Sequence, residues 1–454
     1  MALKVGLVSL GCPKNLVDAE IMLGFIKHSG YDLTNLEQEA DVLVINTCSF
    51  IDEAKEESIK TILELAQYKA DGKCRSLLVT GCLAQRYPQE LLQDIPEING
   101  LVGTGFIPGI AEVIDRTLNG EIVVMVGKPG YLHRADNPRI QATPAYTAYL
   151  KIAEGCDNCC SYCIIPEIRG PYRSRKIEDI LDEAAGFADH GVKELILTAQ
   201  DTTCYGIDLY SRLALDELLK RLEDIEGSVW IRILYTYPTY ITDELIRALA
   251  GGKKVCRYLD IPLQHAADTV LERMNRGGSR GEYVSLIEKL RSAIPGITLR
   301  TSFIVGFPGE TEEEFQELLA FMSLVKFDRV GVFIYSCEEG TAAAKMEGQV
   351  PEDIKVERRD RAMELQQKLS LEINLRKIGE TVTVLVEGIS SEGAGLYEGR
   401  SESDAPDIDG KVFFKSTKDL DQGDFVKVLI ENASWYDLNG VQVERDVSLE
   451  TTDD

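Results

Sequence analysis

The sequence lacks any apolar run close to the roughly 20 residues that a helix needs to cross a bilayer. Its N-terminal stretch, MALKVGLVSLGCPKN, also lacks the basic leader and the long apolar core of an export signal. These two absences argue against membrane insertion and export. We therefore expect a cytoplasmic protein with no membrane partner.

The sequence also has few basic residues relative to acidic ones. The chain of 454 residues has 49 Lys and Arg against 75 Asp and Glu, a net charge of −26. The electrostatic field of so negative a protein repels the phosphate backbones of nucleic acids and attracts basic proteins. The composition favours a basic protein as partner and does not favour direct nucleic-acid binding.

The length predicts about three domains, and the apolar patterns change twice along the chain. Residues 1–120 alternate short apolar runs (KVGLVSLG, ADVLVINT, RSLLVTG) with amphipathic stretches such as NLVDAEIMLGFIKHSG. This alternation predicts a parallel α/β domain. Residues 121–147 carry Pro129, Pro138 and Pro144 and are predicted to form a linker.

A second alternating series covers residues 148–350, with strand candidates YLKIAEG, VKELILTAQ, VWIRILYTY, CRYLDIPLQ, ITLRTSFIVG and RVGVFIYS. Six βα units are too few to close an eight-stranded barrel, so we expect a partial (βα)6 barrel with its site at the carboxyl ends of the strands. Residues 351–378 predict one long connecting helix. Residues 379–454 alternate with Gly-rich turns and predict a small all-β barrel, of a type that often binds oligonucleotides.

Eleven cysteines in a reducing compartment indicate metal ligands or reactive thiols rather than disulfides. Four of them lie in EGCDNCCSYC, residues 154–163. All four could close a zinc site, but zinc ligand pairs normally come from two separated knuckles. Cys156, Cys160 and Cys163 alone give C-x-x-x-C-x-x-C, and an iron–sulfur cube held by three thiolates keeps one iron open to another ligand. In that assignment Cys159 is a bystander, although another ligand register stays open.

Three further cysteines follow predicted strands of the N-terminal domain. Cys12 comes after KVGLVSLG, Cys48 after ADVLVINT and Cys82 after RSLLVTG. Because neighbouring strands lie roughly 4.8 Å apart, thiolates from separate strand ends can surround one cluster. The pattern predicts a second metal centre, while Cys74 lacks this placement.

SFIVGFPGET, residues 302–311, places Gly306, Gly309 and Glu310 at a strand-to-helix junction. Glycine lets the backbone approach a ligand closely, and a helix N-terminus favours negative charge. An ordinary Gly-Pro turn is the alternative. His265, in IPLQHAADT, is a candidate for a cofactor or substrate contact or for a buried structural histidine.

The cysteine loop, with Tyr162 before its last cysteine, resembles that of radical S-adenosylmethionine (SAM) enzymes, and SFIVGFPGET resembles their cofactor-binding strand end. The resemblance implies that Cys156, Cys160 and Cys163 hold a [4Fe–4S] cluster whose open iron binds SAM, giving a 5′-deoxyadenosyl radical on reduction. It implies that Tyr162, Gly306, Gly309 and Glu310 contact the cofactor.

Together with the N-terminal cysteines and the C-terminal barrel, the whole chain resembles the methylthiotransferases. That resemblance implies a second [4Fe–4S] cluster on Cys12, Cys48 and Cys82 and conversion of an unactivated C–H bond to C–SCH3. It also implies a TRAM barrel that binds the substrate and a reductant such as flavodoxin or ferredoxin. A non-enzymatic electron or cluster carrier is the alternative of another class.

Two branches of this family differ in substrate. GCPKNLVDAE, residues 11–20, resembles the branch that modifies the β-carbon of an aspartate in ribosomal small-subunit protein twelve. The other branch modifies transfer-RNA adenosine that carries an N6-isopentenyl or threonylcarbamoyl group, and usually has Gln-Met-Asn there. From Glu380 to Asp454 the chain has 18 acidic and 6 basic residues, a balance of 6 − 18 = −12. This acidity favours a basic protein substrate, docked by exposed acids such as Asp404, Asp407 and Asp409.

Overall fold

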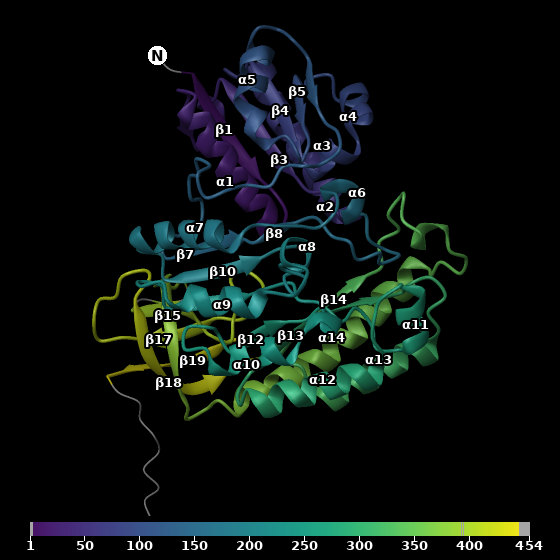
Figure 1. The fold of residues 1–454 in the computed structure, drawn as a ribbon, viewed down its shortest axis with the longest axis vertical. Helices are drawn as coiled ribbons and strands as arrows, with labels where there is room; N and C mark the ends of the chain where they lie inside the picture. Colours follow the sequence, from purple (N-terminus) through teal and green to yellow (C-terminus); the bar gives the residue numbers. More distant parts are fainter. Residues whose placement is uncertain (1–2, 392, 394, 445–454) are drawn as a thin grey trace, which may run out of the picture.

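The structure is a computed structural model that describes residues 3–391, 393 and 395–444 (Figure 1), so the predicted domain ends at residues 1–2 and 445–454 lie outside it. Its N-terminal domain holds a six-stranded parallel sheet in the order β2-β1-β3-β4-β5-β6. The strands are β1 (Lys4–Ser9), β2 (Asp32–Thr34), β3 (Val42–Thr47), β4 (Ser76–Gly81), β5 (Gly100–Val102) and β6 (Val123–Met125). The predicted parallel α/β domain is confirmed.

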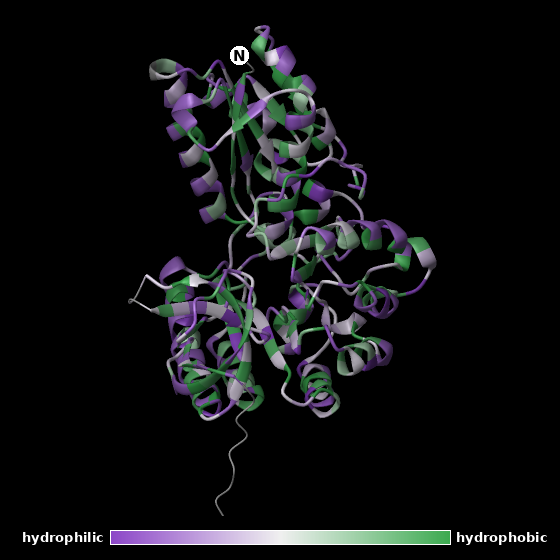
Figure 2. Ribbon diagram, turned by 90° about the vertical axis from the view of Figure 1, so that its left-hand side faces the viewer, coloured by the Kyte–Doolittle hydropathy of each residue, from purple (hydrophilic) through white to green (hydrophobic). Residues whose placement is uncertain are grey.

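Helices cover both faces of this sheet, which explains why β3 and β4 are buried along their whole length. They are α1 (Pro13–His28), α2 (Asp52–Asp71), α3 (Cys82–Arg86), α4 (Pro88–Asp94) and α5 (Ile110–Leu118), with short 3₁₀ turns η1 (Glu37–Glu39) and η2 (Ile107–Gly109). Figure 2 shows the apolar strands enclosed between helices whose outer faces are hydrophilic.

The middle of the chain forms six parallel strands: β7 (Thr147–Lys151), β10 (Glu194–Thr198), β11 (Trp230–Ile233), β12 (Tyr258–Asp260), β13 (Thr298–Val305) and β14 (Arg329–Ile334). They pair as β7-β10-β11 and β12-β13-β14. A parallel bridge between Ile231 and Val255 joins the two groups. The expected six-unit partial barrel is therefore confirmed.

The connections of this barrel carry the helices α6 (Ile165–Arg169), α7 (Ile177–Asp189), α8 (Ile207–Tyr210), α9 (Leu215–Glu223), α10 (Asp243–Gly251), α11 (Asp268–Arg273), α12 (Arg280–Ala293) and α13 (Glu312–Val325). A small antiparallel pair, β8 (Ala153–Glu154) and β9 (Arg173–Ser174), flanks the cysteine loop, and η3 (Pro238–Tyr240) and η4 (Ala343–Lys345) are 3₁₀ turns. Helix α13 begins with a capping box between Thr311 and Glu314.

The long helix α14 (Glu352–Leu375) packs along β14 and α13 and leads into a closed five-stranded barrel. This barrel has the strand order β15-β16-β17-β19-β18. Its strands are β15 (Thr381–Ile389), β16 (Leu396–Ser401), β17 (Val412–Lys415), β18 (Phe425–Ala433) and β19 (Leu438–Val443). The predicted small all-β barrel is confirmed.

The C-terminal barrel packs against the amino ends of the central strands, away from their carboxyl ends. Glu194, the first residue of β10, accepts hydrogen bonds from Arg400 of β16 (2.7 Å) and Arg232 of β11 (2.8 Å). The rings of Trp230 and Phe425 meet edge to face at 4.8 Å between centroids. Buried ion pairs and aromatic packing thus fix one barrel to the other.

Two of the acids expected to face solvent lie inside this contact, so that expectation was wrong for them. Asp404 is buried and pairs with Arg329 at 2.7 Å. Asp409 accepts a 2.6 Å hydrogen bond from the Tyr258 hydroxyl. Asp407 is exposed, as expected. A charge count along the sequence cannot separate internal acids from surface acids.

The stretch predicted as a linker is partly structured, because β6 extends the N-terminal sheet. Beyond it, Arg139 pairs with Glu20 of α1 and, at 2.6 Å, with Glu183 of α7. This segment therefore fastens the N-terminal domain to the central barrel. Among the described residues, no helix is both long and apolar enough to span a membrane.

Candidate metal centres and cofactor site

The first cysteine triad lies at one edge of the N-terminal sheet. Strands β1, β3 and β4 are direct neighbours, and Cys12, Cys48 and Cys82 follow their carboxyl ends. Gly11 has a φ of +88°, and a Cβ there would stand 3.2 Å from the Cys48 Sγ, so only glycine lets the chain turn this closely. The three cysteines come from separate segments of the chain and are brought near one another at the carboxyl ends of neighbouring strands.

The protonation of these thiols reflects their burial. Burial raises the pKa of Cys82 to about 12, with Cys48 and Cys12 adding to the rise and Arg169 opposing it. Burial also raises the pKa of Cys48, again with a contribution from Cys12. Because metal binding requires thiolates, such thiols need a cation before they lose their protons.

The second triad lies in the loop that follows β8. Burial raises the pKa of Cys163 to about 12, with Cys160 and Cys156 adding to it. It raises that of Cys156 to about 11. Cys159 is exposed, whereas Cys156 is buried and Cys160 and Cys163 are half-buried. Cys156, Cys160 and Cys163 therefore lie close enough to affect one another's protonation, and Cys159 is the exposed member of the loop.

All of these cysteines are free thiols. Across residues 3–391, 393 and 395–444, no group of three or more His, Cys, Asp or Glu side chains is gathered tightly enough to hold a single metal ion. An iron–sulfur cube takes each thiolate on a different iron, so its ligands stand further apart than those of one ion. Each triad offers three free thiols, which are the usual ligands of an iron–sulfur cluster. Each is also at least partly buried, so both triads fit such a cluster.

A buried polar network connects the N-terminal triad to residues that flank the barrel cysteine loop. Arg169, at the end of α6, donates to Asp18 at 2.6 Å and to Glu154 at 3.2 Å, and its Nη2 lies 3.6 Å from the Cys82 Sγ. Lys151 of β7 bonds both carboxylates as well, at 2.8 Å to Glu154. Because Asp18 and Cys82 belong to the N-terminal domain, the network crosses the domain boundary.

Asn15 and Lys14 of the N-terminal domain make further contacts across this domain boundary. Asn15 accepts from Arg169, and its amide donates to the Thr47 carbonyl at 2.9 Å. The Lys14 ammonium lies 3.2 Å from the centre of the Tyr235 ring, a cation–π contact with the loop after β11. Burial lowers the pKa of Lys14.

The glycine-rich turn after β13 is closed by one of its own side chains. Gly306 and Gly309 have φ values of +73° and +75°. The Glu310 carboxylate accepts from the Gly306 N–H at 2.8 Å and from Arg358 of α14 at 2.9 Å. Burial raises the pKa of Glu310 to about 7, although Arg358 and the backbone N–H groups oppose the rise. Glu310 therefore shapes the turn, with both carboxylate oxygens already engaged.

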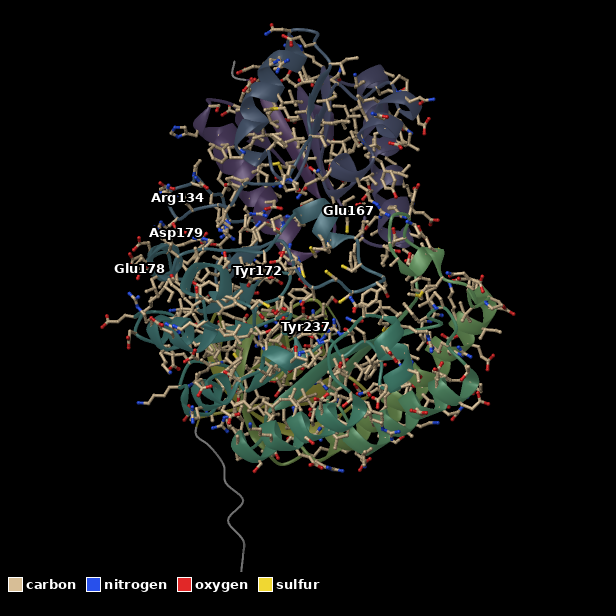
Figure 3. All side chains as sticks on the ribbon, turned by 45° about the vertical axis from the view of Figure 1, so that its right-hand side comes forward. Arg134, Glu167, Tyr172, Glu178, Asp179 and Tyr237 are labelled. Atoms are coloured by element: carbon tan, nitrogen blue, oxygen red, sulfur yellow. The ribbon has the colours of Figure 1, made fainter. Side chains whose placement is uncertain are left out.

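His265 is fully buried, and its Nδ1 accepts from the Ala267 N–H at 3.0 Å. Burial lowers its pKa to about 3, so the ring is neutral. Tyr162 packs beside the cluster formed by Ala267, Phe307 and Tyr335, and its hydroxyl accepts from Arg276 at 3.4 Å. Arg276 also lies 3.6 Å from the Cys160 Sγ. Figure 3 shows Tyr172 and Tyr237 on the side of the central barrel that faces the N-terminal domain.

Sequence reasoning missed Arg169, Lys151 and Arg276 as site residues, because a charged residue has no spacing signature of its own. Arg169 and Lys151 flank the cysteine loop, and Arg276 lies far along the chain. Arg169 and Lys151 could have been found from their position. Two basic residues beside a cysteine loop are notable in a chain with few basic residues.

The fold and the cysteine loop define a radical SAM protein with an added N-terminal domain and a C-terminal TRAM barrel. Residues 150–322 match the radical SAM superfamily, residues 4–103 match an uncharacterized family designated UPF0004, and residues 378–443 match the TRAM domain. The protein from Pelotomaculum thermopropionicum described as ribosomal protein uS12 methylthiotransferase RimO is 63% identical over 443 residues, covering 98% of this chain and all of that protein. The protein of the same description from Desulforamulus reducens is 54% identical, covering 96% of this chain and 98% of its own. The chain belongs to the RimO family of methylthiotransferases.

Membership of the RimO family confirms the expected class of enzyme, a radical SAM methylthiotransferase. It rules out the hypothesis of a non-enzymatic electron or cluster carrier.

Solved structures share the fold at low sequence identity. The radical SAM methyltransferase TsrM from Kitasatospora setae, with tryptophan and a SAM analogue bound, matches with a TM-score of 0.57 at 14% identity. That match covers 81% of this chain and 89% of the TsrM chain.

Proposed function

We propose that this enzyme replaces a C–H bond by C–SCH3 at the β-carbon of an aspartate in ribosomal protein uS12, the small-subunit protein twelve. The observation that carries the proposal is the pair of cysteine triads, one at the carboxyl ends of the N-terminal strands and one in the loop after β8. Arg169, in the helix that follows this loop, contacts Cys82 of the other triad. An unactivated carbon has no acidic proton, so side-chain bases cannot start this reaction and a cofactor must.

In this proposal Cys156, Cys160 and Cys163 hold the [4Fe–4S] cluster to which SAM binds, and Cys12, Cys48 and Cys82 hold a second one. When bound, these groups supply one-electron chemistry and sulfur transfer. The chain contributes a buried setting, because Cys82 and Cys156 are almost fully covered and Arg169 neutralises nearby negative charge. Gly306 and Gly309 allow the turn at the carboxyl end of β13, Glu310 holds that turn, and Tyr162 packs beside the cofactor.

The substrate assignment draws on three supports. Both relatives named above are described as uS12 methylthiotransferases. The chain carries GCPKN after its first strand, and its C-terminal barrel region is strongly acidic. A ribosomal protein is basic because it binds RNA, so an acidic barrel complements it. The enzyme then works in the cytoplasm and takes electrons from a small donor such as flavodoxin or ferredoxin.

The test is mass spectrometry of ribosomal proteins and transfer RNA from cells with and without this chain. We expect uS12 to lose its methylthio group in the deleted cells while transfer-RNA adenosines keep theirs. Methylthiolated adenosine that disappears with the chain, beside an unchanged uS12, would overturn the substrate assignment.

A further inference from the structure

Residues 335–342, the loop between β14 and η4, reach the N-terminal domain, and we call them the strap. The carboxylate of Glu338 accepts hydrogen bonds from Arg86 of α3 at 2.6 Å and from Lys55 of α2 at 3.0 Å. The Glu338 side chain is only 2% exposed, so this contact is shielded from water. These three residues form a clasp, the Glu338 clasp, between the strap and the N-terminal domain.

The Glu338 clasp lies beside the N-terminal cysteine triad. Arg86 ends α3, the short helix that Cys82 begins. The Nη1 of Arg86 also donates to the Ser49 carbonyl at 2.9 Å, and Ser49 directly follows Cys48. One guanidinium therefore joins the strap to the segments that carry two of the three cysteines.

The other end of the strap contacts the barrel cysteine loop. The N–H of Ala343, the residue after the strap, donates to the Ser161 carbonyl at 2.8 Å, and Ser161 directly follows Cys160. Gly340 lies so close to the same loop that a Cβ there would stand 3.2 Å from the Cδ1 of Ile164. The strap therefore contacts the surroundings of both triads.

The strap is a tight turn with its own hydrogen bonds. The hydroxyl and the N–H of Thr341 both donate to the Glu338 carbonyl, at 2.7 Å and 3.1 Å. At its start, the Tyr335 N–H donates to the Val305 carbonyl of β13 at 2.9 Å. Because these bonds limit internal movement, the clasp and the contact with the cysteine loop belong to one stiff segment.

The Glu338 clasp is separate from the Arg169 network and shares no residue with it. Its charges are balanced, because Lys55 also pairs with Asp52 at 2.6 Å, which gives two acids and two bases. Removing one partner of a buried pair leaves the other charge uncompensated, so such a pair is sensitive to substitution. Two separate attachments limit how far one domain can turn against the other.

We propose that Glu338 is a positioning residue that sets the separation of the two cysteine triads. This inference rests on the proposed function, in which both triads act on one substrate carbon, so that carbon has to lie within reach of both. A misplacement of about 1 Å between reacting groups can cost roughly a hundredfold in rate. The clasp thereby links SAM cleavage to formation of the methylthiolated product.

The test compares Glu338→Gln with Glu339→Gln in the reconstituted enzyme. Glu339→Gln is the matched control, because Glu339 is the adjacent acid and is exposed. We expect Glu338→Gln to keep its iron but to form roughly tenfold to a hundredfold less methylthiolated uS12 per SAM cleaved. Electron paramagnetic resonance of the two reduced clusters should show a changed magnetic interaction, because that interaction depends steeply on distance. The control should match the parent in both measurements.

A double-mutant cycle shows whether the effect passes through the clasp. Arg86→Met should cause a similar loss, and the double variant with Glu338→Gln should lose little more than either single variant, because the two residues act as one pair. Lys55→Gln removes only the more exposed partner, whose side chain is 18% exposed. It replaces Glu338→Gln in the comparison if that variant does not load its clusters.

The outcomes separate the inference from the function on which it rests. Full iron with an unchanged product ratio and an unchanged magnetic interaction in Glu338→Gln would overturn the inference. Loss of iron in every clasp variant, Lys55→Gln included, would overturn it too, because the clasp would then serve cluster binding. If the parent forms no methylthiolated uS12, the proposed function fails, and the magnetic interaction still decides whether Glu338 sets the separation of the triads.

Discussion

The Nη2 atom of Arg169 lies 3.6 Å from the Sγ of Cys82, although the two residues belong to different domains. Arg169 ends the short helix after the barrel cysteine loop, and Cys82 begins the helix after β4. One guanidinium therefore ties the helix that follows the barrel cysteine loop to the N-terminal triad. A long, planar side chain with several donors suits this task, because it bonds acids on both sides at once.

Removal of this guanidinium should loosen the domain boundary. In Arg169→Met the buried Asp18 and Glu154 keep only Lys151 as cation, and breaking such a buried pair costs about 3–5 kcal/mol. We expect faster amide hydrogen exchange in α1 and β7 and a lower unfolding temperature. Arg169→Lys keeps the charge and should recover part of the loss. Unchanged exchange in the Met variant would show that the network does not hold the domains.

The barrel triad should account for one of two separable iron sites. Changing Cys156, Cys160 and Cys163 together to Ala should remove about half of the iron and abolish 5′-deoxyadenosine formation from SAM under reduction. Iron analysis and chromatography of the products test this. Cys159→Ala is the matched control, because Cys159 is the exposed member of the loop. We expect this variant enzyme to keep its full iron content. Full iron retention in the triple variant would contradict the assignment.

The N-terminal triad should separate sulfur transfer from radical formation. Substitution of Cys12, Cys48 and Cys82 should leave some reductive cleavage of SAM while eliminating the methylthiolated product, because the other cluster is held elsewhere. Cys74→Ala serves as control, because Cys74 lies just before β4 (Ser76–Gly81) and therefore at the opposite end of that strand from Cys82. Methylthiolated product at the native rate in the triple variant would make this triad merely structural.

The sequence predicted the fold well because its signals are periodic. Apolar runs such as VLVINT marked β3, while β2, β5 and β6, each of three residues, were too short to stand out. The placement of the cysteines predicted both triads, and their role as cluster ligands stays a prediction. Arg169 and Glu338 were not identified, because their role depends on partners from another domain. The same reason hid the burial of Asp404 and Asp409.

The contact between the barrels should weaken in acid. Burial acts to raise the pKa of Glu194, but the guanidinium groups of Arg400 and Arg232 outweigh it and hold the pKa at about 2, below the usual 4.5. This stabilisation is complete above pH 4.5 and is lost as the pH falls towards 2. The difference between the two pKa values, 4.5 and about 2, corresponds to about 3 kcal/mol of folding stability. Limited proteolysis between pH 5 and 2.5 should release the C-terminal barrel, whereas Glu194→Gln should weaken its attachment already at pH 7. Equal resistance of parent and variant at pH 7 would contradict this.

Surface acids of the C-terminal barrel should steer the basic substrate towards the enzyme. Asp419, Asp421 and Glu431 are exposed, unlike Asp404 and Asp409. Reversing these three to Lys should slow association with uS12 more than it speeds dissociation, because exposed charges act mainly on encounter. The effect should shrink with salt, as the screening length falls from about 10 Å at 0.1 M to about 3 Å at 1 M.

A matched reversal elsewhere separates local steering from net charge. Glu53, Glu57 and Glu64 of α2 are equally exposed, and changing them to Lys alters the total charge by the same amount. If the barrel guides the substrate, stopped-flow association rates should fall clearly more for the barrel variant than for the α2 variant. Equal losses in the two variants would mean that the overall field of the protein attracts uS12 and that the barrel has no special part. Faster binding of transfer RNA to the barrel variant would be expected in either case, because added lysines attract phosphate.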